Sequence, residues 1–145
     1  MKQYHTLFLF LFGIGLSLNA QTDSYSEVYK TLKANDSLLF QHSFNKCELQ
    51  YLDQLISDDF EFYHNNGGIL DTKKQFIQTM KDGICDSNNT TKSSKELVGE
   101  LQVFPLYSDE KLYGALQNDI HNFHETTNRT KVAGSTAKFS HLWLL

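Results

Sequence analysis

The spacing of apolar residues predicts two amphipathic helices at the start of the polar part of the chain. In residues 26–45, Val28, Leu32 and Phe40 recur at helical intervals, with charged residues on the opposite side. In residues 47–56, four apolar residues fall at positions i, i+3, i+6 and i+7 of a helix. Each segment therefore has one apolar face to bury against a core.

A short hairpin and a third helix are predicted next. Apolar and polar residues alternate over 60–64, and Asn66-Gly67-Gly68 is typical of a hairpin turn. Thr72, with Gln75 three residues later, is typical of a capping box at a helix N-terminus. Apolar residues line one face of the segment that follows, and we expect this helix to end near residues 83–85.

The second half of the chain has the pattern of long strands. Three strands are predicted, over 95–107, 112–124 and 132–145, with Pro105 breaking the first of them. The polar residues 86–94 are expected to form a solvated loop. The order of elements predicts an α+β fold, with the N-terminal helices packed on one face of a curved, mostly antiparallel sheet.

The first 20 residues have the pattern of a secretory signal peptide. Lys2 precedes an apolar run from Leu7 to Leu16, and the small residues that follow predict cleavage after Ala20. The run is shorter than the ~20 apolar residues that cross a bilayer. We therefore expect an exported protein, periplasmic or secreted, with no membrane attachment after cleavage. An uncleaved N-terminal anchor is the alternative.

Composition agrees with one globular domain and limits its partners. The chain has 145 residues, of which 40% are hydrophobic and 13% aromatic, and these fractions exclude a disordered chain. Residues 1–20 contain one Lys and no acidic residue, so the predicted mature chain has 12 basic and 17 acidic residues, a net charge of -5. This acidic balance argues against nucleic acid as a partner.

Cys47 and Cys85 form the one cysteine pair of the predicted mature chain. In an oxidising compartment they could form a disulfide, whose loop of about 39 residues would contribute ~4 kcal/mol to stability in the chain-entropy account. Two buried free thiols are the alternative, because sequence alone does not show that the two side chains are close.

Two stretches of sequence resemble the nuclear transport factor 2-like superfamily. They are Asp58-Asp59-Phe60-Glu61-Phe62-Tyr63-His64, followed by Gly67-Gly68, and Phe139-Ser140-His141-Leu142-Trp143. The likeness covers residues 25–145 and is strongest to small exported bacterial members of unassigned function. It implies a cone in which helices and a curved sheet enclose an elongated apolar pocket.

The resemblance leaves the function open. Relatives include ketosteroid isomerase, scytalone dehydratase, polyketide cyclases and noncatalytic modules, and the catalytic residues of the enzymes match no motif here. Such members usually continue from the Trp-containing strand into a further strand with another Trp. Residues 21–145 are therefore expected to be a C-terminally truncated domain of this type.

In a cone of this kind, inward-facing polar residues of the strands would line the pocket. Alternate residues of a strand share a face, and the odd-numbered face of residues 113–123 mixes aromatic and polar side chains as a pocket lining would. We expect this face to point inward. The expected ligand-binding residues are Tyr63, His64, Tyr113, Gln117, His121 and His141.

Histidines at these positions suggest two kinds of chemistry. A zinc site made by His64, His121 and His141 is disfavoured, because a turn near residue 128 would place His121 opposite residues 135–137, about 13 Å from His141 along the strand. No metal and no cofactor is therefore expected. The candidates for proton transfer are His64, Asp119 and His121. The alternative is that Asp119 faces solvent and the histidines are structural.

Three interpretations remain at this stage. The first is an exported domain that binds a small, largely apolar molecule, with or without catalysis. The second is a noncatalytic module that forms a homodimer through its open sheet face, where it would bury residues such as Leu142 and Leu144. The third is an inactive, truncated product.

Overall fold

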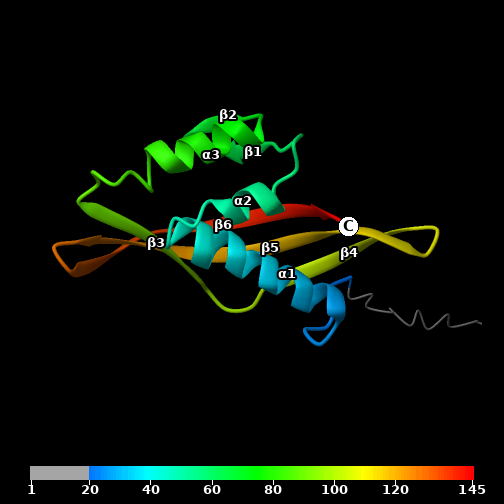
Figure 1. Cartoon of the computed structure of the whole chain (residues 1–145). Helices are drawn as coiled ribbons and strands as arrows, with labels where there is room; N and C mark the ends of the chain where they lie inside the picture. Colours follow the sequence, from blue (N-terminus) through cyan, green and yellow to red (C-terminus); the bar gives the residue numbers. More distant parts are fainter. Residues whose placement is uncertain (1–19) are drawn as a thin grey trace, which may run out of the picture.

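Four helical segments cover one face of a sheet in the computed structural model, which describes residues 20–145 (Figure 1). They are α1 (Glu27–Ser37), the π-helix η1 (Leu38–Phe44), α2 (Gln50–Leu55) and α3 (Lys73–Asp82). The predicted signal peptide lies, apart from Ala20, outside the described residues. In the described part, no helix is both long and apolar enough to span a membrane.

Side-chain caps start two of the helices. The Ser26 hydroxyl accepts a hydrogen bond from the Tyr29 amide, and the Thr72 hydroxyl accepts one from the Gln75 amide. The predicted start of the third helix is confirmed by the second of these caps. Each cap satisfies an amide that has no partner within its helix.

The predicted helix over residues 26–45 consists of two helix types. α1 passes directly into η1, where the Asn45 amide donates to the carbonyl of Phe40, five residues earlier, at 2.9 Å. The Ser43 hydroxyl also donates to a carbonyl five residues earlier, that of Leu38, at 2.9 Å. The wider turn buries Phe40, Ser43 and Phe44 together, a face that α-helical spacing alone does not predict.

The strands form two separate antiparallel sheets. β1 (Phe62–His64) and β2 (Gly68–Leu70) form the predicted hairpin. In the larger sheet, β5 pairs with β3 and β4 along one edge and with β6 along the other. Its strands are β3 (Thr91–Leu97), β4 (Gln102–Ser108), β5 (Lys111–Thr127) and β6 (Thr130–Leu144). The predicted α+β arrangement, with helices on an antiparallel sheet, is confirmed.

One predicted strand was wrong in its bounds. Residues 95–107 belong to two strands, β3 and β4, which run in the same direction along one edge of β5. They are separated by a break at residues 98–101, which includes Gly99 with a φ of +82°. β3 starts at Thr91, inside the predicted loop, because polar residues also suit an exposed edge strand. Pro105 does not end a strand: it lies within the edge strand β4, where a missing N–H is tolerated.

The β5–β6 hairpin sets the register of the site. Asn128 and Arg129 have φ values of 50° and 66° and form its two-residue turn. The predicted turn near residue 128 is confirmed, and His121 lies opposite Ala137, within the predicted 135–137.

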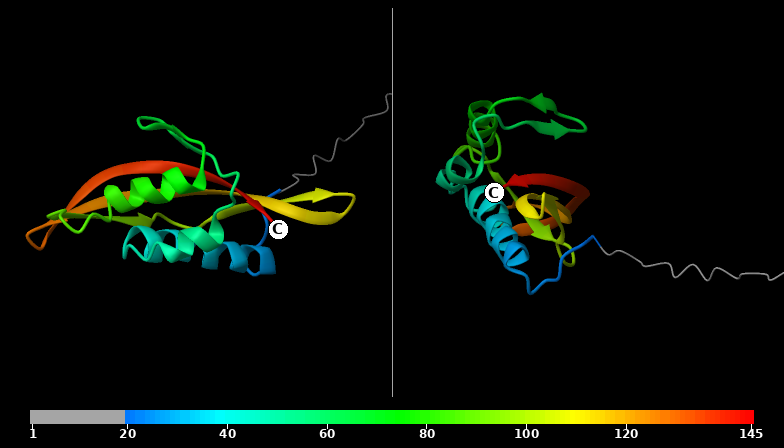
Figure 2. Two further views of the ribbon diagram at one scale, coloured as in Figure 1. Left: turned by 45° about the horizontal axis from the view of Figure 1, so that its top comes forward. Right: turned by 90° about the vertical axis from the view of Figure 1, so that its right-hand side faces the viewer.

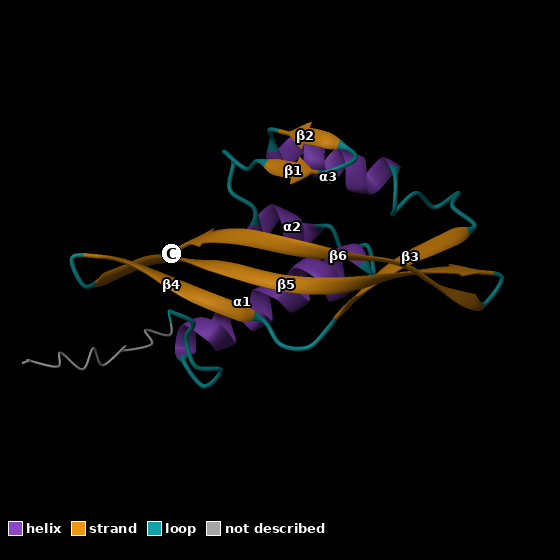
Figure 3. Cartoon of the chain, turned by 180° about the vertical axis from the view of Figure 1, so that it is seen from behind, coloured by secondary structure: helices purple, strands orange, loops and turns teal. Residues whose placement is uncertain are grey.

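The core lies between the helices and one face of the larger sheet, whose long strands bend along the helices (Figure 2). Seen from behind, the opposite face of β4, β5 and β6 carries no described helix (Figure 3). We call these the helix face and the open face. One core cluster contains Tyr29, Leu32, Leu101, Val103 and Ala115. The other contains Phe40, Phe44, Leu52, Ile56 and Met80.

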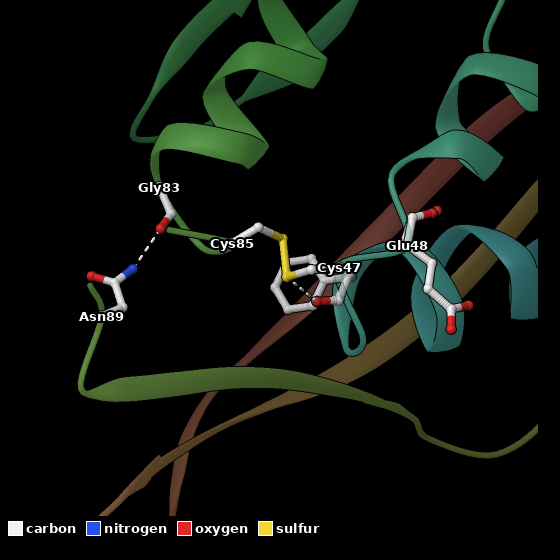
Figure 4. The surroundings of a disulfide bond; sticks show 7 residues. Cys47, Glu48, Gly83, Cys85 and Asn89 are labelled. Carbon is white, nitrogen blue, oxygen red and sulfur yellow. Dashed lines mark hydrogen bonds between the residues drawn. A yellow bond between two sulfur atoms is a disulfide. The ribbon is translucent and has the colours of Figure 1, made fainter. Parts of the chain in front are cut away.

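Cys47 and Cys85 form a disulfide with an S–S distance of 2.08 Å (Figure 4). It joins the segment that follows η1 to the segment that follows α3. Nearby, the side-chain amide of Asn89 donates to the Gly83 carbonyl at 2.5 Å. The predicted pairing is confirmed, and the alternative of two free thiols is wrong.

Candidate functional site

A row of alternate β5 residues points from the sheet toward the helices. Ala115, Gln117, Asp119 and His121 are buried there, as the odd-numbered face was predicted to be. Tyr113 is the exception, with 45% of its surface exposed. It lies near the β4–β5 hairpin, which projects beyond the helices (Figure 1).

Gln117 joins three elements in this layer. Its amide nitrogen donates to Asp36 of α1 at 2.8 Å and to Asp119 of β5 at 2.9 Å. Its amide oxygen accepts a hydrogen bond from the indole nitrogen of Trp143, in β6, at 2.8 Å. Since an indole N–H can only donate, this bond fixes the orientation of the Gln117 amide. The carboxylates of Asp36 and Asp119 are thereby held together between α1 and β5.

Several buried polar atoms in the layer lack a hydrogen bond. Nδ1 of His121 lies 3.1 Å from Oδ1 of Asp119, and neither atom makes a well-directed hydrogen bond in the described structure. Nδ1 of His141 is also buried without a partner. Buried polar atoms are nearly always hydrogen-bonded in proteins, so these three mark a place where a further group would be stabilised.

Aromatic rings form the apolar surroundings of the two histidines. The ring centroid of His121 lies 4.3 Å from that of Phe40 and 5.0 Å from that of Phe139. His141 lies 5.7 Å from Phe40 and 6.2 Å from Trp143. Phe40 of η1 thus contacts both histidines, and it covers the polar groups from the helix side.

Lys95 of β3 is buried beside this layer. The centroids of four phenyl rings lie between 4.1 and 5.0 Å from its Nζ. The Asn45 side chain fixes the Lys95 backbone. Its Nδ2 donates to the Lys95 carbonyl at 2.9 Å, and its Oδ1 accepts a hydrogen bond from the Lys95 backbone amide at 2.7 Å. The four rings belong to Phe40, Phe44, Phe123 and Phe139.

The two carboxyl groups differ in pKa. Burial raises the pKa of Asp36 from 3.8 to about 6, and the charge of Asp119 acts in the same direction. Burial also acts to raise the pKa of Asp119, but the neighbouring His121 and the hydrogen bond from the Gln117 amide bring it below its ordinary value. Near pH 6, a carboxyl that can donate a proton therefore lies beside a carboxylate that can accept one.

Burial also favours the neutral forms of two bases. It lowers the pKa of His141 from 6.5 to about 4, against the opposing charge of Asp119. It lowers the pKa of Lys95 from 10.5 to about 7, against the charges of Asp119 and Asp36. At neutral pH His141 is therefore an uncharged hydrogen-bonding group.

Tyr63 and His64 are not part of this layer, which corrects the prediction that one pocket is lined by all six residues. They lie on the β1–β2 hairpin, with Tyr63 67% exposed and His64 also exposed. Nδ1 of His64 accepts hydrogen bonds from the amides of Asn66 and Gly67, so it serves the turn. The hairpin forms its own sheet and does not extend the larger one.

Of the three candidates for proton transfer, the structure brings together Asp119 and His121 and leaves out His64. The alternative that Asp119 faces solvent is wrong, because only 6% of this residue is exposed. The helices cover the β5 face that carries it.

Sequence reasoning missed Asp36, Lys95 and Trp143. Asp36 had a usable signal: it lies four residues after Leu32 and four before Phe40, so the apolar stripe itself places an acid on the buried face. Lys95 gave no such signal, since a strand lysine is usually exposed. Trp143 was part of the recognised motif, but its hydrogen bond to Gln117 depends on the β5–β6 register.

Two shallow surface depressions lie beside α3, away from the polar layer. One is bordered by Leu70, Gln75 and Gln78, and the other by Asp53, Lys73 and Ile77. Neither includes a residue of the layer, which η1 and its Phe40 cover in this structure.

Comparison with known proteins supports the fold. The sequence matches no protein-family model, and it has no significant match among curated proteins. A structure from Catenulispora acidiphila, at 10% identity, superposes with a TM-score of 0.62 over 81% of this chain and 86% of that chain. Another from the same organism, in complex with S-DNPA, has 12% identity and a TM-score of 0.54 over 81% of this chain and 78% of that chain.

Proposed function

We propose that this chain is an exported domain of the nuclear transport factor 2-like superfamily that binds a small, largely apolar molecule on the helix face of its sheet. The two sequence motifs support the superfamily assignment, and the α+β architecture is compatible with it. The disulfide supports export, because such bonds persist in oxidising compartments.

The observation that carries the binding proposal is the set of buried polar atoms that make no well-directed hydrogen bond. Nδ1 of His121, Nδ1 of His141 and Oδ1 of Asp119 offer hydrogen bonds beneath the rings of Phe40 and Phe139. A ligand with an apolar body and a hydroxyl or carbonyl group would satisfy these atoms and pack against the rings.

Access to the layer requires η1 to move. Phe40 contacts both histidines, so a ligand that reaches them displaces this ring. The β1–β2 hairpin forms a separate sheet, but α3 is tied to η1 by their shared core cluster and by the disulfide. Binding is therefore expected to be coupled to a local rearrangement of η1.

Intrinsic fluorescence can test this proposal. Trp143 is the one tryptophan of the chain and is hydrogen-bonded to Gln117. We expect a panel of small phenols and cyclic ketones, with 2-naphthol as the first probe, to change Trp143 emission and to raise the melting temperature. Naphthalene, which lacks the hydroxyl, should have a smaller effect.

The His121→Ala variant should lose the ligand-induced stabilisation, and the matched His64→Ala variant should keep it. An equal stabilisation in both variants, or none in the wild type for any member of the panel, would contradict binding at the polar layer.

A second candidate is a homodimer formed through the open face. Phe104, Leu116 and Leu142 lie side by side across β4, β5 and β6, and Leu144 continues the apolar row. Leu142 is 62% exposed and Leu144 69% exposed. A contiguous apolar patch of this kind favours a protein partner.

Sedimentation equilibrium tests the dimer. We expect concentration-dependent association in the wild type and a monomer in Leu142→Asp. Thr130→Asp, at the far end of the same strand, is the matched control and should still associate. A wild type that remains monomeric at high concentration would argue against this candidate.

A further inference from the structure

Three buried side chains converge where α1 packs on β5. Asp36, Asp119 and His121 each bring one potential ligand atom to within 4.8 Å of the others. Their exposed fractions are 7%, 6% and 1%. We propose that these three side chains form a binding site for a divalent metal ion of the zinc type.

The spacing of two donor atoms supports this site. Nδ1 of His121 and Oδ1 of Asp119 are 3.1 Å apart, and neither has a well-directed hydrogen bond. Neighbouring ligands of an ion about 2.1 Å from each of them lie roughly 3.0–3.4 Å apart. An ion between the two atoms would satisfy both at once, with Asp36 as the third ligand.

The charge balance of the site also favours a cation. Two carboxylates are buried there, and a buried negative charge needs a compensating partner. Lys95 does not supply it directly: its Nζ lies among four phenyl rings, and within residues 20–145 it forms no ion pair with a carboxylate. A metal ion would provide positive charge at the carboxylates themselves.

Surrounding groups hold the ligands in place. Gln117 donates to one oxygen of each carboxylate, and Trp143 fixes the Gln117 amide. The His121 ring is held between Phe40 and Phe139. Supporting contacts of this kind orient metal ligands and raise affinity.

The donor set selects the class of metal. One imidazole nitrogen and two carboxylate oxygens suit Zn²⁺ and its first-row neighbours, whereas Mg²⁺ and Ca²⁺ prefer oxygen donors alone. This inference goes beyond the proposed function, because the metal would bind without any organic ligand. The metal would use Nδ1 of His121 and Oδ1 of Asp119, the same atoms as the proposed ligand, so the two would compete. The two proposals can still fail separately, because Zn²⁺ binding is measured with no organic ligand present.

Calorimetric titration of the EDTA-treated protein with ZnCl₂ tests the site. We expect binding of about one equivalent per chain, with Mg²⁺ and Ca²⁺ much weaker. Asp119→Asn and His121→Gln should each reduce Zn²⁺ affinity by roughly 100-fold. Circular dichroism would verify that each variant is folded.

A surface pair provides the matched control. His42 and Glu48 lie 2.6 Å apart near the surface and could bind Zn²⁺ adventitiously, so His42→Gln should leave the stoichiometric binding unchanged. His124→Gln, on the same strand as His121, should do the same.

A measurement on the wild type keeps the test valid if a variant does not fold. Co²⁺ should produce d–d absorption bands, and Zn²⁺ should shift the ¹⁵N resonance of Nδ1 in His121. The proposal is overturned if the wild type binds no Zn²⁺, if both site variants bind it unchanged, or if His42→Gln abolishes binding.

Discussion

Gln117 is the residue through which the helix layer, the central strand β5 and the edge strand β6 are connected. Its amide bonds Asp36, Asp119 and Trp143, which belong to α1, β5 and β6, and none of its surface is exposed. Removing it would leave two carboxylates and an indole N–H without these partners. The penalty for such buried groups is larger than the net gain from an ordinary hydrogen bond.

We therefore predict that Gln117→Leu lowers the free energy of unfolding by about 2–4 kcal/mol. Urea denaturation followed by circular dichroism would measure the change. Asn118→Leu is the matched control on the neighbouring position, where the side chain accepts a hydrogen bond from Ser140 in an exposed setting. A Gln117→Leu variant no less stable than this control would contradict the role of the network.

Lys95 gives the protein a pH dependence whose sign follows from its pKa. The group has a pKa of about 7 in the folded chain against 10.5 for the free side chain, mainly because of burial. The unfolded chain therefore holds this proton more tightly between pH 7 and 10.5. The Lys95 contribution becomes more favourable to folding as pH rises through that range.

We predict that the wild type gains about 2 kcal/mol over Lys95→Met between pH 7 and pH 9. Denaturant titrations of both proteins at each pH isolate Lys95 from the other groups that face it, Asp119 and Asp36. Lys92→Met, exposed on the same strand, should follow the wild type. A stability difference that does not change with pH would contradict a lowered pKa for Lys95.

At the scale of elements, the disulfide is the covalent link between η1 and α3. Cys47 and Cys85 are 38 residues apart, and the loop they close contains α2, the β1–β2 hairpin and α3. This loop contributes no strand to the larger sheet. Loss of the disulfide should therefore affect the loop before it affects β5 and β6.

We predict that Cys47→Ser with Cys85→Ser lowers the free energy of unfolding by about 4 kcal/mol, because the unfolded chain gains loop entropy. Hydrogen exchange measured by mass spectrometry should become faster in α3 and remain slow in β5. A uniform increase over both elements would show that the link supports the whole fold rather than the loop.

The periodicity of apolar residues predicted where helices and strands occur. It did not predict that one helix is of the π type or that one strand is interrupted. The β5 face that carries Gln117 and His121 followed from simple alternation, and the turn at Asn128 followed from its polar sequence. The π-helical geometry of η1 did not, because apolar spacing does not distinguish five-residue from four-residue hydrogen bonding. The break at Gly99 was missed because a single glycine is also compatible with a continuous strand.

At the scale of the whole molecule, the candidate site could be predicted only in part. Asp119, His121 and His141 were identified because strand parity and register depend on local sequence. Tyr63 and His64 were placed wrongly in the pocket because parity does not say which sheet a hairpin joins. Asp36 and Lys95 reach the site through packing between elements, which depends on the complete fold.

The predicted cleavage site lies close to the folded part of the chain. The Thr22 amide donates to the Val103 carbonyl of β4 at 2.8 Å, two residues after the predicted cleavage position. We predict that the exported protein begins at Gln21, as intact mass and N-terminal sequencing would show. Leu11→Lys, within the apolar run, should block export. An exported product that retains Met1 would contradict cleavage.

The π-helix lets this segment hold one residue more than an α-helix could without changing which side faces the sheet. In a continuous α-helix, a rotation of about 100° per residue would place Phe44 roughly 80° away from Asp36, whereas the wider turn of η1 buries both. A one-residue deletion at the exposed Gln41 would let the segment become α-helical and still leave Asp36 and Phe44 on the same side. Among natural variants, a deletion between Leu38 and Phe44 should therefore be tolerated better than an insertion.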